Sequence, residues 1–289
     1  MSHYYLGVDG GATKCVARLC NSDGTLCERR AGAASLTNDL TQAIATVQDV
    51  CHQLLTEAGL TPEQVHLAAG LAGAGKSDAA QAVHTALTNA GYASVHITTD
   101  AQTSLLGAGA GEPMVMVAVG TGSVAMRLSA DGKITQVGGW GLAVGDEGSG
   151  AAVGKSAVRA LLWELDLHGE PQTKLSRHVV EQVGRERAAI LRWLSQAGPK
   201  EYAALAPAVF EFLPYCPLAQ KIARKTASEV EQLIRAASGD QDLPITLLGG
   251  LAQNMSDLLS PDLRAKLVAP KGTALDGACT LARQRHQFS

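Results

Sequence analysis

The stretch LGVDGGATKCVARL, residues 6–19, decides the fold, because the stretch VMVAVGTGSVAMRL, residues 115–128, repeats its pattern. A shift of 109 positions places Gly11 on Gly120 and aligns an Arg-Leu pair at the end of both copies. In each copy an apolar run ends in a Gly/Thr turn, and a second alternating run follows it. Alternating runs on both sides of a glycine turn are typical of a β-hairpin. The sequence therefore predicts the same hairpin twice.

Each hairpin continues into a third strand. A polar turn that contains Asp-Gly follows both copies, at residues 23–24 and 131–132, and a short alternating run comes next. In the first copy we expect strands over residues 4–9, 14–20 and 25–30. Glycine at the tip lets main-chain N–H groups come close to a ligand, and a Thr or Ser hydroxyl adds a donor. We interpret the two tips as a duplicated clamp that holds a polyphosphate from both sides.

Strands and helices alternate after the first meander. We expect a helix capped by Asn38 or Asp39, a strand over 65–71, a helix over 77–90 and a strand over 95–98 that leads to Asp100. This alternation requires a sheet with a parallel part, in which sites lie at the carboxyl ends of the strands. The second half predicts a glycine-rich loop over 138–150, helices up to residue 238, strands over 244–248 and around Leu267, and a closing helix over 273–285.

Length, charge and cysteine content narrow the class of protein. A chain of 289 residues is long enough for about two domains. The net charge is −3, and the Lys and Arg residues are scattered along the chain. We therefore expect no binding to nucleic acid or to a membrane surface. The six cysteines form no CxxC pair, which favours buried thiols in a reducing compartment. Since the first strand starts near Tyr4 and no apolar run has the length of a membrane helix, we expect a cytoplasmic protein.

A second phosphate-loop pattern competes with the hairpins. The stretch GLAGAGKS, residues 70–77, matches the P-loop pattern G-x-x-x-x-G-K-[ST] and follows a predicted strand. In a P-loop NTPase, Lys76 would bind phosphate and Asp100 could serve as the acidic metal ligand. Such a domain does not need the duplicated hairpins, and a chain with 31 glycines can match the pattern by chance. We therefore favour the hairpins and keep the P-loop as the alternative.

Three short motifs resemble the actin-like ATPase superfamily. DGGATK at residues 9–14 and GTGS at 120–123 resemble its two phosphate motifs, and LLGGLA at 247–252 resembles its adenosine motif. Within the superfamily the chain is most similar to the N-acetylglucosamine kinase and glucosamine kinase branch of the BadF/BadG/BcrA/BcrD ATPase family. SLTN at 35–38 and GGWGLAVGDEGSG at 138–150 carry this resemblance, and so does the end of the chain.

The resemblance implies an α/β fold of the duplicated actin-like, ribonuclease H-like type, with two domains around a nucleotide cleft. The first domain is expected over residues 1–112. The second is expected over 113–289, with a helical insertion at about 150–240. The closing helix, at about 273–289, can pack back on the first domain.

The activity implied by the resemblance is an ATP-dependent hexosamine kinase that phosphorylates glucosamine or N-acetylglucosamine, at O6. Phosphoryl transfer relies on positioning, on Mg²⁺, and on a carboxylate that accepts the hydroxyl proton. Asp100 is our candidate for this base, although it could instead cap a helix. Asp9 would hold Mg²⁺ through water. The remaining expected ATP contacts are Gly10, Gly11, Thr13, Lys14, Gly120, Thr121, Gly122, Ser123, Gly249 and Gly250; Lys14 could instead be a solvated strand residue.

The sugar is expected to contact Asn38, Asp100 and Asp146. Asn38 could instead be a helix cap, and Glu147 could share the role of Asp146. Animal N-acetylglucosamine kinases resemble GTGSN at the second hairpin, whereas Val124 follows Ser123 here. The absence of the Asn side-chain amide at this position favours glucosamine over N-acetylglucosamine as the substrate.

Other functions fit parts of the pattern. An activator or amino-sugar sensor would bind ATP without turnover, but it would not need a base such as Asp100. The family resemblance also makes a homodimer possible, with the helical insertion as its surface. The expected partners are thus ATP and a small amino sugar.

Overall fold

The computed structural model describes residues 3–286 of the chain, with side chains up to residue 284. Contacts between residues divide it into two compact units. The first unit comprises the described residues up to Met114, the short segment Leu128–Ile134 and the part that begins at Ala269. The second unit comprises Val115–Arg127 and Thr135–Val268. The closing part of the chain therefore belongs with its beginning.

The first unit is built on a five-stranded sheet in the order β3-β2-β1-β4-β5. β1 pairs antiparallel with β2, and β2 with β3, whereas β1, β4 and β5 run parallel. The first three strands agree with the predicted meander, and the parallel part agrees with the predicted alternation. The strand bounds are β1 Tyr4–Gly10, β2 Cys15–Cys20, β3 Thr25–Ala31, β4 Val65–Leu71 and β5 Ser94–Thr99.

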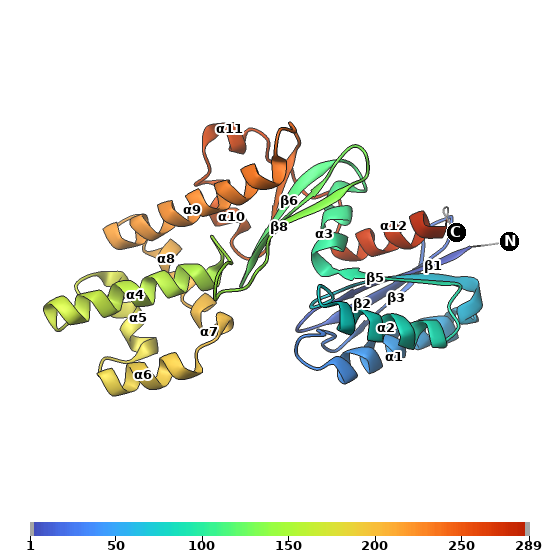
Figure 1. Cartoon of the computed structure of the whole chain (residues 1–289), viewed down its shortest axis with the longest axis horizontal. Coiled ribbons are helices and arrows are strands. Elements are labelled where there is room, and N and C mark those ends of the chain that lie inside the picture. Colours follow the sequence, from blue (N-terminus) through green and yellow to red (C-terminus); the bar gives the residue numbers. More distant parts are fainter. Residues whose placement is uncertain (1–2, 287–289) are drawn as a thin grey trace. The chain divides into compact units, whose positions relative to one another are not determined.

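Helices cover both faces of this sheet. Figure 1 shows α1 and α2 on one face, and α12 on the other beside α3. The bounds are α1 Leu40–Ala58, the 3-10 turn η1 Pro62–Gln64, α2 Ser77–Asn89, α3 Asp100–Gly109 and α12 Ala274–His286. Of the two possible caps for α1, Asp39 is the one used, since its side chain accepts the Gln42 N–H.

α3 and α12 meet with their backbones in contact. A Cβ atom on Gly107 would overlap the carbonyl of Thr273, and one on Gly277 would overlap the carbonyl of Thr103. The side chain of Thr103 in turn fills the space beside Gly70 on β4. Only glycine allows this approach, so α3 is held directly against the sheet and the closing helix.

The second unit repeats the meander. Its sheet has the order β8-β7-β6-β9, and β9 runs parallel to β6 as β4 does to β1. This confirms the duplication predicted from the two glycine hairpins. The expected strand around Leu267 is wrong, because Leu267 makes only an isolated bridge with Ile245. The strand bounds are β6 Met114–Val119, β7 Ser123–Leu128, β8 Ile134–Gly138 and β9 Ile245–Leu248.

A set of helices between β8 and β9 forms the helical insertion. Leu161, Leu175 and Ile234 are fully buried in its core. None of the helices in residues 3–286 has both the length and the apolar character that a membrane span requires. The bounds in this unit are α4 Gly150–His168, α5 Lys174–Val183, α6 Arg187–Gln196, α7 Pro199–Ala203, α8 Ala206–Glu211, α9 Pro217–Ser238, α10 Ala252–Ser256 and α11 Pro261–Arg264.

We predict that Gly277→Ala destabilises the protein, although alanine is the better helix former by about 1 kcal/mol. The new Cβ would overlap a backbone carbonyl of α3. Overpacking of this kind costs about 1–3 kcal/mol, which thermal unfolding would measure. Gly75→Ala is the control, since a Cβ there meets nothing within 4 Å. An unchanged or raised melting temperature for Gly277→Ala would contradict the close contact.

Candidate functional site

The carboxyl ends of three parallel strands meet at one edge of the first sheet. Gly10 of β1 pairs in register with Leu71 of β4, and Leu71 pairs with Thr99 of β5. Asp9 lies one position before this row, and Asp100 one position after it. The fold thus brings together two carboxylates that are 91 residues apart in the sequence.

Asp100 is the first residue of α3 but is not its cap. The cap is Thr99, whose hydroxyl accepts the Gln102 N–H at 3.2 Å. The Asp100 carboxylate accepts the N–H of Ala101 at 3.0 Å. Burial raises the pKa of Asp100 above its ordinary value, although this hydrogen bond acts in the opposite direction. A buried carboxylate with a raised pKa is a stronger proton acceptor, which suits a general base.

Asp9 shares the environment of Asp100. Burial raises the pKa of Asp9, the Asp100 carboxylate raises it further, and the ammonium group of Lys14 lowers it. Lys14 therefore acts on Asp9 through its charge, although its side chain is exposed. The two neighbouring carboxylates carry two negative charges, and Lys14 supplies one positive charge. The excess negative charge would attract a further cation.

The residues fit Mg²⁺ held through water. The part of the chain that the structure describes contains no group of three or more acidic, His or Cys side chains that could hold a metal ion. Mg²⁺ does not need such a group, since it keeps several waters and takes other ligands from one or two carboxylates and substrate phosphates. Asp9 at the end of β1 can supply such a carboxylate.

The two hairpin tips present free amides at equivalent positions. In the first tip, the N–H groups of Ala12 and Thr13 donate no hydrogen bond within the described residues. In the second tip, the same holds for Thr121 and Gly122. These pairs are related by the shift of 109 positions found in the sequence. Adjacent free N–H groups form an anion site, as expected for phosphate.

The carbonyl groups of the tips are in use. Gly120 and Thr121 accept hydrogen bonds from Gly150 and Ala151 at 2.8 and 3.1 Å, so the second tip rests on the amino end of α4. In the first unit, the Gly11 carbonyl likewise accepts an N–H from outside the hairpin, at 3.0 Å. These tip carbonyls therefore accept hydrogen bonds from the rest of the protein, whereas the free amides named above can still donate to a ligand. The positive end of the α4 dipole also favours an anion there.

A pocket of about 420 Å³ lies beside the second tip. It brings together Gly120, Thr121 and Gly250, which the sequence assigned to ATP. Gly249 has a φ of +96° and lies against the Val119 carbonyl, so the Gly-Gly turn folds onto the hairpin. The sequence analysis missed the rest of the lining: Gly150, Ala203, Ala206, Pro207 and Leu251.

Ser123 and Asp146 bind each other instead of lining this pocket. The Ser123 N–H donates to Asp146 Oδ1 at 3.3 Å, and the Ser123 hydroxyl donates to the Glu147 carbonyl at 2.7 Å. Asp146 is 7% exposed, and burial raises its pKa. The Glu147 side chain is exposed. The pair fixes the glycine-rich loop to the end of the second hairpin.

Glu229 on α9 holds the same loop and was missed from the sequence. Its Oε2 accepts the Gly148 N–H at 2.9 Å, and its Oε1 pairs with Lys225. Gly148 lies so close to Val230 that a side chain would not fit. A Glu on an amphipathic helix gives no sign in the sequence that it contacts a distant loop.

The loop that carries Asn38 is attached to the GLAGAG loop. Leu36 donates its N–H to the Ala72 carbonyl at 2.8 Å, and Thr37 packs against Gly73. The Asn38 side chain is exposed and does not cap α1. It is thus free for a ligand of the first unit.

The GLAGAGKS stretch uses three of its backbone amides within the protein. In a P-loop the backbone amides face the phosphates. Here the N–H groups of Ala72, Ala74 and Lys76 donate to carbonyls at 2.9, 3.1 and 3.2 Å. These amides join the stretch to β1 and close its own turns. The geometry therefore argues against the P-loop alternative.

Comparison with known proteins identifies the family of this chain. The sequence model of the BadF/BadG/BcrA/BcrD ATPase family matches residues 6–282. The chain belongs to this family. A relative named glucosamine kinase GspK, from Vibrio cholerae serotype O1, is 32% identical over 290 residues, which cover 97% of this chain and 96% of the relative. An N-acetylmuramic acid/N-acetylglucosamine kinase of Clostridium acetobutylicum is 24% identical over 97% of this chain and 98% of its own.

The fold of this ATPase family member also matches solved structures. A protein from Chromobacterium violaceum, described as a candidate N-acetylglucosamine kinase, superposes with a TM-score of 0.85 and 34% identity over 97% of this chain and 99% of that one. This confirms the predicted two-domain, actin-like α/β fold.

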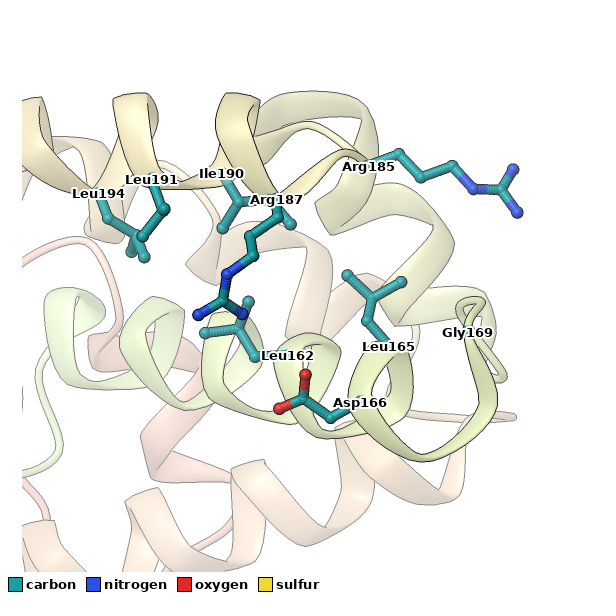
Figure 2. A pocket seen from close by; sticks show the side chains of 9 residues that line it. All are labelled: Leu162, Leu165, Asp166, Gly169, Arg185, Arg187, Ile190, Leu191 and Leu194. Atoms are coloured by element: carbon teal, nitrogen blue, oxygen red, sulfur yellow. The ribbon is translucent and has the colours of Figure 1, made fainter.

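A second hollow of about 370 Å³ lies within the helical insertion. Figure 2 shows leucine side chains of α4 and α6 facing one another across it, with Arg187 pointing in and Arg185 pointing away. It includes none of the residues predicted for ATP or sugar. We therefore place the candidate site at the hairpins.

We predict that Glu229→Ala weakens nucleotide binding on the order of fivefold, or about 1 kcal/mol. The variant frees Gly148 and thereby loosens the loop that holds the second hairpin. A fluorescent ATP analogue would measure the affinity. Glu229→Gln, which keeps an oxygen acceptor, should restore it.

The matched control is Glu231→Ala on the same helix. Glu231 also accepts a backbone N–H, from Ser260 at 2.6 Å. Ser260 does not belong to the glycine-rich loop, whereas the Gly148 that Glu229 binds does. Both alanine variants should lower the melting temperature, and only Glu229→Ala should affect the nucleotide. Equal effects of the two on affinity would contradict a positioning role for Glu229.

Proposed function

We propose that this protein is an ATP-dependent hexosamine kinase that transfers the γ-phosphoryl group to glucosamine or N-acetylglucosamine, at O6. The observation that carries the proposal is the pair of hairpin tips with free amides, together with the half-buried Asp100 carboxylate directly after β5. Membership of an ATPase family and two relatives named as hexosamine kinases support it.

The nucleotide is assigned to the second tip and the pocket beside it. The amides of Thr121 and Gly122 donate to phosphate oxygens, and the Thr121 hydroxyl adds a donor. Gly250 lies on the pocket wall, where the absence of a side chain leaves space for a flat base. Ser123 is buried and supports this tip from within, so its contribution is to position the tip.

The first tip contributes charge and further donors. The amides of Ala12 and Thr13, with the Thr13 hydroxyl, bind phosphate oxygens, and Lys14 supplies a positive charge. Gly10 and Gly11 allow the close approach. Asp9 holds Mg²⁺ through water, and the ion, when bound, neutralises developing charge on the phosphates.

Asp100 accepts the proton of the sugar hydroxyl. As the hydroxyl oxygen bonds to the γ-phosphorus, its proton passes to the carboxylate and the bond to ADP breaks. The Ala101 N–H fixes one carboxylate oxygen, which orients the group without protonating it. Burial increases its basicity, so the ionised acid is a more effective acceptor than an exposed aspartate.

The sugar is assigned to Asn38, Asp100 and Asp146. Asn38 is exposed on a loop that the GLAGAG stretch supports, and Asp146 orders the glycine-rich loop. The exposed Glu147 is also available to a 2-ammonium group. Val124 lies against Gly139 at the start of that loop, so an apolar contact replaces the amide of the acetylated-sugar kinases. We therefore rank glucosamine first.

The alternative is an ATP-binding activator or sugar sensor without turnover. Asp100 argues against it, since partial burial raises the pKa of its carboxylate and a sensor without turnover has no need of a base. We place the kinase in the cytoplasm, where ATP is available and where its six free cysteines would stay reduced. The homodimer stays a prediction: Trp163 and Leu167 are 64% and 68% exposed on α4, and sedimentation velocity would measure the oligomeric state.

The test of the proposal is ADP production with a panel of glucosamine, N-acetylglucosamine, glucose, mannosamine and N-acetylmuramic acid. We expect rapid, sugar-dependent ADP formation with one hexosamine, glucosamine before the others, and a product phosphorylated at O6. No turnover across the panel while ATP still binds would favour the sensor.

We predict that Asp100→Asn lowers kcat by about 10²–10⁴-fold, the usual contribution of a general base. Nucleotide affinity and the melting temperature should be retained, because the amide fills the same space. Asp78→Asn is the control: Asp78 also follows a parallel strand in the first turn of a helix, but it is exposed. Near-normal turnover of Asp100→Asn would remove Asp100 as the base.

A further inference from the structure

Two cysteines that the kinase mechanism does not use lie in contact in the first unit. Cys20 ends β2 and Cys279 lies on α12, and their Sγ atoms are 3.8 Å apart although the residues are 259 positions apart in the sequence. The two side chains are 3% and 7% exposed. Close packing places them together, since Cys279 occupies the space that a Cβ on Gly7 would need.

Contacts on both sides of the pair hold α12 against the strand. Arg283, one turn after Cys279, donates to the Asn21 carbonyl at 2.9 Å, directly after Cys20. One turn before Cys279, Asp276 forms an ion pair with Arg18 of β2. The two sulfurs are therefore a fixed feature of this face and not a chance approach of mobile side chains.

The two thiols differ in acidity. Contact with the Cys279 thiol lowers the pKa of Cys20 to about 6; burial opposes this, while the Thr25 hydroxyl and the charges of Arg283 and Arg18 lower it further. The same contact and burial raise the pKa of Cys279. Cys20 is thus the more acidic thiol of the pair and Cys279 the less acidic one, which suits a nucleophilic and a resolving cysteine.

The other cysteines provide a contrast. Burial raises the pKa of Cys15 to about 12 and also raises that of Cys51. Cys27 is more exposed than these, yet its pKa is raised by partial burial and by Glu57. These thiols stay protonated near neutral pH, and protonated thiols react slowly with peroxides.

We propose that Cys20 and Cys279 form a modification site at which a hydroperoxide produces an intrachain disulfide. The Cys20 thiolate attacks a peroxide oxygen and the O–O bond breaks. A sulfenic acid forms, and the departing hydroxide (or alkoxide) takes a proton from solvent to become water (or alcohol). The Cys279 sulfur then attacks the Cys20 sulfur, the S–O bond breaks, and the oxygen leaves as water with the Cys279 proton. Two thiols are oxidised to one disulfide, and one peroxide is reduced.

Access and geometry are compatible with this chemistry. Cys20 directly precedes the turn 21–24, whose residues are exposed or half-buried, so local opening of this turn admits a small oxidant. The sulfurs must approach from 3.8 Å to about 2.05 Å, which is a small side-chain movement. In a reducing cytoplasm the bond would be transient, as is usual for redox-sensing disulfides.

The experiment uses the full chain, reduced, desalted and treated with a small excess of hydrogen peroxide at neutral pH. Of the six thiols, four should remain after denaturation, with a mass loss of about 2 Da and one cross-linked Cys20–Cys279 peptide. Dithiothreitol should restore all six. Cys27→Ser should behave like the parent protein, whereas Cys20→Ser and Cys279→Ala should form no such cross-link.

The bond should also raise the melting temperature by several degrees, because it closes a loop of more than 250 residues. Reaction at Cys27 alone, with Cys20 and Cys279 still free after prolonged treatment, would overturn the proposal. So would a cross-link that forms equally well in Cys20→Ser. Neither result depends on kinase activity, so the assignment as a hexosamine kinase is tested separately.

Discussion

The candidate site depends on which backbone groups of two hairpin tips are already hydrogen-bonded. N–H groups at the amino end of α4 donate hydrogen bonds to the carbonyls of Gly120 and Thr121. In the first tip, the Ala34 N–H donates to the Gly11 carbonyl. Each tip is thereby fixed by its acceptors, and two adjacent N–H groups in each tip have no acceptor among the described residues. Backbone amides cannot change charge or rotamer, so the donors that we propose for phosphate are in position before any ligand arrives. This preorganisation explains why nearly featureless glycine turns can carry the chemistry.

The position of the base has a different origin. Asp100 begins α3, and two close backbone contacts hold α3 in place. The Thr103 carbonyl lies against Gly277 of α12, and the Thr273 carbonyl lies against Gly107 of α3. A larger residue at either glycine would move the helix whose first residue is the carboxylate. The packing of the closing helix therefore helps to place the carboxylate that we propose as proton acceptor, although α12 has no residue in the candidate site.

Much of this could be predicted from the sequence, for physical reasons that differ between elements. The meanders follow from alternation, and the end of α1 follows from Gly59, which adopts the left-handed conformation that glycine favours. Asp9, Thr121 and Gly250 could be proposed for the site because glycine-rich strand ends have few structural uses. Glu229 and the pocket wall at Ala203 and Pro207 were missed, since they depend on tertiary packing of helices with ordinary patterns. Likewise, the spacing of residues in the sequence gives no sign that Asp146 is buried and accepts a hydrogen bond from the Ser123 N–H.

The return of α12 to the first sheet has a consequence for biosynthesis. The strands β1 and β4 leave the ribosome before the second unit, but α12, which covers one of their faces, is made only after that unit. Until then α3 alone covers part of that apolar face, whereas the second unit can already close around β9 and α9. The unit encoded first is thus completed last. During translation its exposed face is the surface most open to chaperone binding or aggregation.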